Sequence, residues 1–286
     1  MTTTANGTAT GQTPFGREQR SHDGKRVIDY SKDGHVALIV LNDPPANTYT
    51  HEMMRQLDEA LLDARFDGDV EVILITGAGE KFFCAGANIG MLNSVTPEFK
   101  YNFCLHANET LAKFEQTPKL IVAGLNGHCV GGGLEIAMAA DIRIARKDAG
   151  KIGLPEVALG VLPGTGGTQR LARLVGKSRA IELMATGRTF SFEQALDYGM
   201  ISDIFEGDAA AFREQMLTYA KQFTSPNKAP MAIGHIKRSV QTGIELPLSD
   251  ALTLERELQS LLFKSEDAKE GIAAYNEKRM AHFKNK

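Results

Sequence analysis

Short apolar runs that alternate with helical patterns are the feature of this sequence that most constrains its fold. Two nearly unbroken runs lie at 70–76 and 120–123, and a further short strand pattern follows at 142–145. An apolar run of this length is typical of a strand buried on both faces, as in a parallel sheet covered by helices. Patterns with helical spacing separate the runs, at 50–66, 97–115 and 132–140. The alternation predicts an α/β core with parallel strands.

The two ends of the chain differ from this core. The N-terminal segment is rich in Thr, Gly and Ala and contains no apolar run, which predicts a disordered tail without a secretory signal. From about residue 206 the pattern is helical throughout, and prolines interrupt it. We therefore predict a tail over 1–24, an α/β core over 25–205 and a C-terminal helical region over 206–286.

Composition limits the classes of function. Lys and Arg total 32 against 35 Asp and Glu, so the net charge is -3 and no broad nucleic-acid surface is expected. No stretch is long and apolar enough to cross a bilayer, so no membrane contact is expected. Cys84, Cys104 and Cys129 are too widely spaced for a disulfide framework or a zinc site. These observations together predict a cytoplasmic protein that holds no metal.

A run of three glycines, Gly131 to Gly133, opens the helix predicted at 132–140. The first turn of a helix leaves N–H groups unpaired, and the helix dipole adds to their attraction for negative charge. Glu135 lies three residues after Gly132, about one turn inside the same helix. An anion at the Gly132 N–H would therefore lie close to a carboxylate. The alternative is a glutamate that only complements the helix dipole.

Two further segments are candidates for the same site. Residues 82–88, Phe-Phe-Cys-Ala-Gly-Ala-Asn, follow a buried strand, and the N–H of Ala87 is a candidate second donor to the anion. Two converging main-chain donors form an oxyanion hole, which suits reactions through an enolate or a tetrahedral oxyanion. Glu156, directly after Pro155, is either a second site carboxylate or an exposed loop residue. The glycines at 164–167 lack the Gly-Lys-Ser/Thr ending of a phosphate-binding P-loop.

Together these segments resemble the enoyl-CoA hydratase/isomerase (crotonase) family, from about residue 26 to the end of the chain. The resemblance rests on Asn126-Gly127 with Gly131 to Glu135, on Asp141-Ile142, and on Pro155-Glu156 followed by 159–170. It implies a crotonase-like spiral of ββα turns and a C-terminal helical region that forms trimers, often paired into hexamers. It also implies an acyl-CoA thioester substrate, with coenzyme A as part of the substrate and no separate cofactor.

The resemblance assigns roles to four groups. The N–H groups of Ala87 and Gly132 would bind the thioester oxygen. Family members that hydrate have glutamates at both positions that match Glu135 and Glu156, whereas many isomerases keep one. Two facing carboxyls can divide the acid and base work of hydration. Glu135 would hold and deprotonate the water, and Glu156 would deliver a proton to the α-carbon.

The resemblance also implies a set of residues that bind substrate and CoA: Ala46, Ala85, Ala87, Asn88, Ile89, Gly132, Tyr275 and Lys278. Tyr275 and Lys278 would lie near the CoA of a neighbouring subunit. The sequence departs from the family at Asn88, where Asp is usual, and at Gly90, where a basic residue often helps to bind the nucleotide. We expect 91–101 and the helices near Phe263 to shape the acyl pocket.

The leading hypothesis from the sequence is a 2-enoyl-CoA hydratase that gives a 3-hydroxyacyl-CoA. Double-bond isomerisation and thioester hydrolysis are alternatives on the same scaffold. A non-catalytic member that binds RNA or a protein is a third alternative, and the slightly acidic charge balance counts against RNA. The sequence does not define the acyl group.

Overall fold

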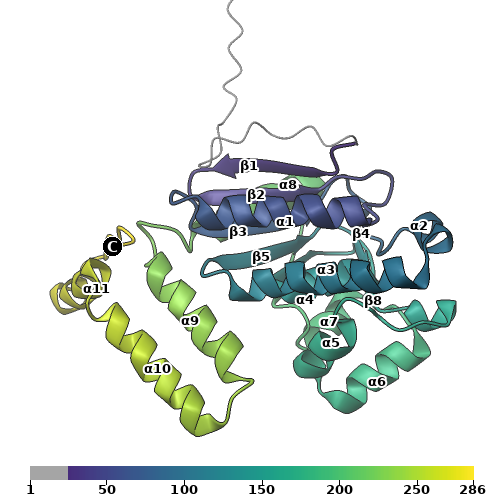
Figure 1. Ribbon diagram of the computed structural model, residues 1–286. Coiled ribbons are helices and arrows are strands. Elements are labelled where there is room, and N and C mark those ends of the chain that lie inside the picture. Colours follow the sequence, from purple (N-terminus) through teal and green to yellow (C-terminus); the bar gives the residue numbers. More distant parts are fainter. Residues whose placement is uncertain (1–24) are drawn as a thin grey trace, which may run out of the picture.

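The computed structural model describes residues 25–286, and a sheet of six strands forms its core (Figure 1). The tail predicted over 1–24 lies outside the described residues. The strands are, in order across the sheet, β1 (Ile28–Asp33), β2 (Val36–Leu41), β3 (Val72–Gly77), β5 (Leu120–Leu125), β7 (Ile142–Arg146) and β9 (Asp203–Phe205). β1 and β2 form an antiparallel hairpin, with Gly34 at a φ of 58° in its turn. The other neighbouring strands pair in parallel, as the apolar runs predict.

A second, smaller sheet consists of β4 (Phe82–Cys84), β6 (His128–Val130) and β8 (Ile152–Gly153), paired in parallel. Each of these strands follows a strand of the large sheet and precedes helical structure. The helical elements that follow them are α2 (Ile89–Ser94) and α3 (Pro97–Gln116), then α4 (Gly132–Ala139), then the 3-10 helix η1 (Glu156–Leu159) and α5 (Gly167–Val175). The chain therefore makes three successive ββα turns, and the predicted spiral fold is confirmed.

Glycine is required at the corner between the two sheets in each turn. A Cβ atom built on Gly77 would lie 2.4 Å from a backbone oxygen of β4, and one on Gly127 would lie 2.3 Å from the carbonyl group of Lys81. A Cβ on Gly150 would lie 2.4 Å from the backbone nitrogen of His128. These neighbours are main-chain atoms, so no side-chain rotation can make room. The backbones of successive turns therefore pack directly on one another.

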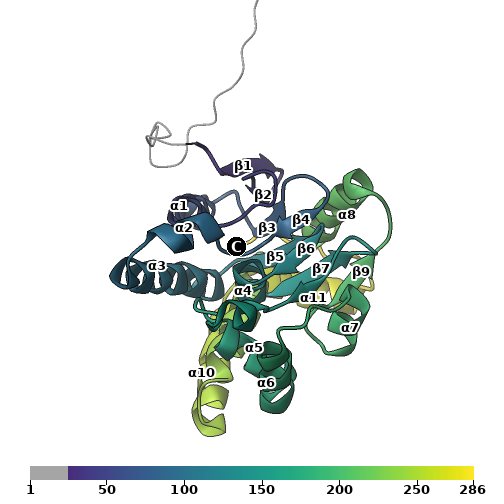
Figure 2. The same cartoon turned by 90° about the vertical axis from the view of Figure 1, so that its right-hand side faces the viewer.

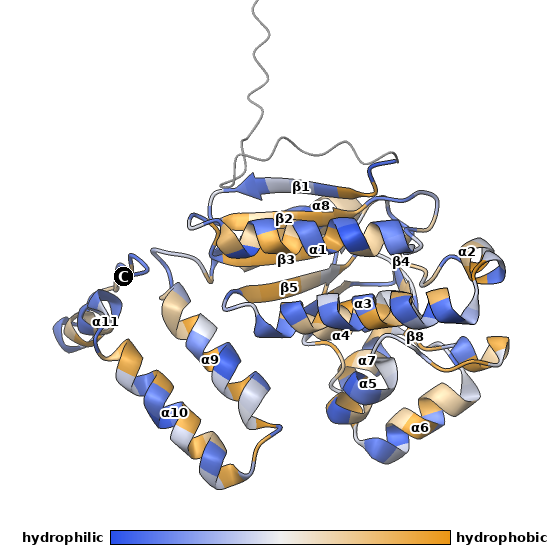
Figure 3. Ribbon diagram, viewed as in Figure 1, coloured by the Kyte–Doolittle hydropathy of each residue, from blue (hydrophilic) through white to orange (hydrophobic). Residues whose placement is uncertain are grey.

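The large sheet is covered by helices on both faces. β2, β3 and β5 are buried along their whole length, and Figure 3 shows them as continuous apolar segments. α1 (His51–Phe66) and α3 lie on one side of the strands and α8 (Ala209–Lys221) on the other (Figure 2). α8 buries Phe212, Met216 and Ala220 against the sheet. The segment after residue 206 therefore begins with a helix that belongs to the core.

Helix α4 lies at the centre of the molecule, and all of its residues are buried. It contacts α3, α5, β4 and β6, so a side chain on α4 is fixed from several directions. Two further helices complete this part of the chain, α6 (Lys177–Thr186) and α7 (Phe192–Asp197).

The C-terminal helices stand to one side of the sheets (Figure 1). They are α9 (Pro230–Gly243), α10 (Leu248–Leu262) and α11 (Glu266–Glu277). A buried lysine fastens α9 to the core: Lys237 Nζ pairs with Asp141 Oδ2 at 2.8 Å and donates to the carbonyl oxygen of Phe114 at 2.7 Å. Within 25–286, no helix is long and apolar enough to cross a membrane.

Candidate active site

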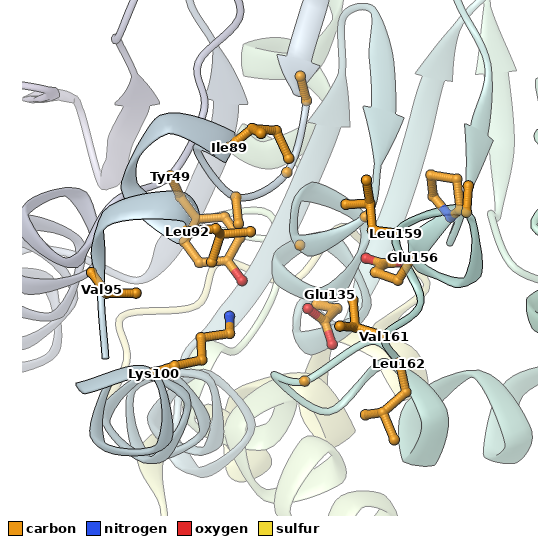
Figure 4. Close-up of a pocket in the computed structure, with 18 of the residues that line it drawn as sticks. Tyr49, Ile89, Leu92, Val95, Lys100, Glu135, Glu156, Leu159, Val161 and Leu162 are labelled. Carbon is orange, nitrogen blue, oxygen red and sulfur yellow. The ribbon is translucent and has the colours of Figure 1, made fainter. Parts of the chain in front are cut away.

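A pocket with a volume of about 560 Å³ lies beside the N-terminal end of α4 (Figure 4). Five segments line it: Tyr49 before α1, the loop from β4 to α2 with α2 itself, the start of α3, the junction of β6 with α4, and η1 with the loop after it. The sequence-predicted site residues that line it are Ala85, Ala87, Ile89, Gly132, Glu135 and Glu156. The spiral therefore brings together residues from all three ββα turns.

The loop before α5 holds Glu135, a residue that is only 1% exposed. Glu135 Oε1 accepts hydrogen bonds from the backbone N–H groups of Thr165 (2.8 Å) and Gly167 (2.7 Å), and Oε2 accepts one from the Thr165 hydroxyl. A carboxylate has about four lone-pair sites. Three donors occupy part of this capacity, so the carboxylate is fixed in orientation and can still accept a hydrogen bond from a water in the pocket.

Glu156 is the first residue of η1, directly after Pro155, and is half-buried. Its Oε2 is buried and has no hydrogen-bond partner within residues 25–286. Burial, and to a smaller degree the negative charge of Glu135, raise the pKa of Glu156 from 4.5 to about 7, while the positive charge of Lys100 opposes the rise. A carboxyl group with this pKa can act as a proton donor or acceptor near neutral pH.

Gly131 makes room for the Glu156 carboxylate. Its φ is 56°, and a Cβ built on it would lie 2.9 Å from Glu156 Oε1. Another residue at this position would therefore strain the backbone and displace the carboxylate. The glycine run places the first turn of α4 directly against the second acidic residue.

The N–H groups of Ala87 and Gly132 belong to two chain segments that touch, since a Cβ built on Gly86 would lie 3.2 Å from the backbone nitrogen of Gly132. Tyr49 N donates to Gly86 O (3.0 Å) and Asn88 N donates to Tyr49 O (3.1 Å). Ala87 is the residue between Gly86 and Asn88 and pairs with Tyr49 in an isolated parallel β-bridge. Because successive residues of an extended segment face opposite ways, the N–H of Ala87 points away from Tyr49. Neither amide has a hydrogen-bond acceptor in the described part of the chain. Two unpaired main-chain donors therefore lie at the pocket wall.

Asn88 and Ala46 lie next to the pocket but do not line it. The Asn88 side chain caps α2, where it accepts a hydrogen bond from the Met91 N–H at 2.9 Å, and it donates to the Thr48 hydroxyl. The carbonyl oxygen of Ala46 accepts a hydrogen bond from the Ala85 N–H at 3.0 Å. In this structure both residues shape the loops around the pocket.

Tyr275 and Lys278, at the end of α11, lie far from the pocket of their own chain (Figure 1). Tyr275 is 85% exposed. Phe263, which follows α10, is exposed as well and is not part of the pocket lining. Within the single chain, none of these residues lines the pocket.

Sequence reasoning did not single out three polar residues of the site, Tyr49, Lys100 and Thr165, although Lys100 lies within the segment 91–101 that was expected to shape the acyl pocket. Tyr49 is buried, its hydroxyl lies 3.3 Å from Thr165 Oγ1, and its ring fills the space beside Gly132. Thr165 had a visible signal, because it stands between Gly164 and Gly166 in a glycine-rich loop. Tyr49 had none, since only the fold brings it to the pocket, and nothing distinguished Lys100 from the other residues of its segment.

Apolar side chains form most of the remaining wall. Leu92 and Val95 come from the segment 91–101, which was expected to shape the acyl pocket. Leu159, Val161 and Leu162 come from η1 and the loop after it (Figure 4). The apolar wall suits the hydrocarbon part of a ligand.

A sequence model described as enoyl-CoA hydratase/isomerase matches residues 31–286. The chain belongs to the enoyl-CoA hydratase/isomerase family.

Relatives in this family are similar over almost their whole length. The chain is 45% identical to the protein in a crystal structure of an enoyl-CoA hydratase from Geobacillus kaustophilus HTA426, with a TM-score of 0.88, over 92% of this chain and 98% of the other. It is 38% identical to a probable enoyl-CoA hydratase of Bacillus subtilis (strain 168), over 90% of this chain and 98% of the relative. It is 37% identical to (E)-benzylidenesuccinyl-CoA hydratase of Thauera aromatica, over 87% and 96%.

The cysteine near the family's glycine-rich loop is inert in this structure. Cys84 is fully buried, and burial raises the pKa of its thiol to about 12. Nucleophilic attack needs the thiolate. Cys84 is therefore not a candidate nucleophile.

Proposed function

We propose that this protein is an enoyl-CoA hydratase, which adds water across the α,β-double bond of a 2-enoyl-CoA thioester to give a 3-hydroxyacyl-CoA. The observation that carries the proposal is the convergence of two carboxyl groups and two unpaired main-chain amides on one pocket. The family and the named hydratases among its relatives support the choice of substrate class.

In the proposed reaction the thioester carbonyl oxygen accepts hydrogen bonds from the N–H groups of Ala87 and Gly132. Attack of water on the β-carbon places negative charge on this oxygen as an enolate, and the two donors stabilise that charge. The removal of one such donor typically lowers turnover about 100- to 1,000-fold. Gly132 is the first residue of α4, so the helix dipole adds to its effect.

The two glutamates divide the proton transfers. Glu135, held by the loop at Thr165, accepts the proton that leaves the attacking water. Glu156, with its raised pKa, donates a proton to the α-carbon as the enolate collapses. Each turnover leaves Glu135 protonated and Glu156 ionised, and proton exchange with solvent restores both.

The second carboxyl group favours hydration over double-bond isomerisation, because an isomerase only has to move one proton between two carbons of the substrate. Glu156 has an unpartnered oxygen within the described residues and a pKa suited to proton transfer, which supports an active role for it. The names of the relatives differ in the acyl group, from short-chain to benzylidenesuccinyl and 2,3-dehydroadipyl, so the acyl group has to be sought in the pocket of this chain.

The test uses a four-carbon 2-enoyl-CoA, the purified protein and the variants Glu135→Gln and Glu156→Gln. We expect the wild-type protein to form 3-hydroxyacyl-CoA, identified by its mass, and each variant to lose turnover by about 100-fold or more. Conversion of a 3-enoyl-CoA to its conjugated isomer without water uptake would identify an isomerase. Release of free CoA would identify a hydrolase. Wild-type turnover in both variants would overturn the assignment of the two carboxyl groups.

We also propose that the protein self-associates through its C-terminal helices. Ile236 and Val240 on α9, with Ile244 directly after its end, form an apolar stripe at helical spacing, with 63%, 63% and 69% exposure in the single chain. A stripe of this kind marks an interface, and a second copy of the chain would also bring Tyr275 and Lys278 to a CoA-binding groove. Val240→Glu should lower the mass measured by sedimentation, and an unchanged mass would contradict this interface.

A further inference from the structure

Lys100 is a cation in the pocket to which the proposed reaction gives no role. It lies in the first turns of α3 and extends from that helix into the pocket, across from Glu156 in the view of Figure 4. Within residues 25–286 its ammonium group has no ion-pair partner and no hydrogen-bond acceptor, and its closest described interaction is with the ring of Phe103, 5.1 Å from the ring centroid. A lysine at a pocket wall without an anionic partner is unusual, because surface lysines are normally solvated or paired.

The other charged groups of the pocket do not neutralise this lysine. Glu135 directs its carboxylate to Thr165 and Gly167. Glu156 is within electrostatic reach of Lys100, but no hydrogen bond or ion pair joins the two groups, and burial raises the pKa of Glu156 to about 7, so this carboxyl group is only partly ionised near neutral pH. Lys100 is therefore a half-buried positive charge beside the apolar side chains of Leu92 and Val95, and an anionic group of a ligand would find its partner there.

We infer that Lys100 binds a carboxylate at the far end of the acyl chain, so that the preferred substrate is the 2-enoyl-CoA thioester of a dicarboxylic acid. The inference rests on the proposed function, because it takes the acyl group of that substrate as the ligand. Lys100 is then a specificity-determining residue, since it contacts a part of the substrate that does not react.

The arrangement of the pocket supports this assignment. The amides of Ala87 and Gly132 fix the thioester carbonyl, and the two glutamates fix the position of the reacting double bond. The remainder of the acyl chain has to follow the apolar wall. Lys100 lies on this wall together with Leu92 and Val95. Its flexible stem lets the ammonium group reach a carboxylate as a point charge without strict geometry.

If Lys100 acts on Glu156 rather than on the substrate, its substitution has a different effect on turnover. If the lysine acted only through Glu156, by lowering the pKa of that carboxyl group, its removal would change the turnover of every 2-enoyl-CoA alike. A substrate-binding role changes the ratio between charged and uncharged substrates. The two roles are therefore separated by a comparison of substrates that have the same length and differ only in the terminal group.

The experiment compares 2-hexenedioyl-CoA, which ends in a carboxylate, with 2-hexenoyl-CoA, which ends in a methyl group. We expect the wild-type protein to have the higher kcat/KM on the carboxylate. Lys100→Met should lower the ratio of the two kcat/KM values by about 10- to 100-fold, mainly through KM, which is the range of a charge-assisted hydrogen bond. Lys100→Arg should retain most of the ratio. Lys228→Met, which removes an exposed lysine between α8 and α9, should leave the ratio unchanged.

A binding measurement separates this inference from the proposed reaction. Adipyl-CoA and hexanoyl-CoA have no double bond, so calorimetric titration measures recognition without turnover. Tighter binding of adipyl-CoA that disappears in Lys100→Met supports the role of Lys100, even if the protein hydrates neither unsaturated substrate and the proposed function fails. Equal binding of both saturated thioesters, or an equal loss for both substrates in Lys100→Met, would overturn the role of Lys100 and leave hydration intact.

Discussion

Glu135 and Thr165 are 30 residues apart in the sequence and are joined by two hydrogen bonds, from the backbone N–H of Thr165 at 2.8 Å and from its hydroxyl group. The Thr165 hydroxyl also lies 3.3 Å from the Tyr49 hydroxyl. A carboxylate buried on a central helix is costly unless donors surround it. The loop before α5 supplies these donors, and it thereby fixes the direction in which Glu135 presents its remaining lone pairs.

Thr165→Val tests this relationship, because it keeps the shape of the side chain and removes the hydroxyl group. The change leaves Glu135 Oε2 without its donor, at a cost of about 1–3 kcal/mol for a buried group. We expect kcat for hydration to fall about 10- to 100-fold, with a smaller change in KM. Thr165→Ser restores a hydroxyl group and should recover most of kcat. Turnover of Thr165→Val at the wild-type rate would show that the orientation of Glu135 does not depend on this bond.

The pKa of Glu156 predicts how hydration depends on pH. Glu156 donates a proton to the α-carbon, so the active form is the protonated one, which predominates below a pKa of about 7. We therefore expect kcat to fall as the pH rises above about 7. Lys100 lowers this pKa, so Lys100→Met should move the fall to higher pH. A kcat for 2-hexenoyl-CoA that stays constant between about pH 6 and pH 9 would contradict the role of Glu156 as the acid.

The sequence predicted the parts of the structure that carry a local pattern. β3 and β5 were found because burial on both faces requires unbroken apolar runs. The strands of the small sheet were missed, because two or three residues are too few to show any period. The glycine corners that join the two sheets depend on contacts between different turns, which a single segment of sequence does not reveal.

The residues of the candidate site likewise fall into those with a local sequence pattern and those without one. Gly132 and Glu135 could be proposed because a glycine run and a carboxylate at one helix start form a local pattern. The sequence left Glu156 open between a site residue and an exposed loop residue, since its burial depends on packing against the start of α4. The sequence placed Lys100 only within the segment 91–101 expected to shape the acyl pocket, and the position of α3 beside the pocket is what singles it out.

Gly131→Ala separates backbone strain from displacement of Glu156. Gly131 has a φ of 56°, and an added Cβ would lie 2.9 Å from Glu156 Oε1. Gly34 is a control with a similar φ of 58° and open space around the position of a Cβ. Gly34→Ala should lose about 1–2 kcal/mol of unfolding free energy, measured in urea, from its positive φ, and Gly131→Ala, whose ψ of -133° lies outside the left-handed helical region, should lose at least as much. Only Gly131→Ala should also lose kcat, by about 10-fold or more, because it displaces the acid. Equal kcat values for the two variants would show that hydration does not depend on the position of Glu156 beside Gly131.

Glu156→Gln should raise stability at alkaline pH. The pKa of Glu156 is raised from 4.5 to about 7, so between these values the native state binds more protons than the unfolded state. Stability therefore falls as the pH rises through this window, and it stays lower above the native pKa, where a buried carboxylate is ionised. Glutamine does not ionise, so the variant should gain Tm relative to wild type at about pH 8 and gain less at about pH 5. Glu135→Gln is the contrasting control, because its amide group would face donors from Thr165 and Gly167 and should lower Tm at both pH values. If thermal melts give the same Tm difference between Glu156→Gln and wild type at both pH values, Glu156 is not a carboxyl group that burial keeps protonated.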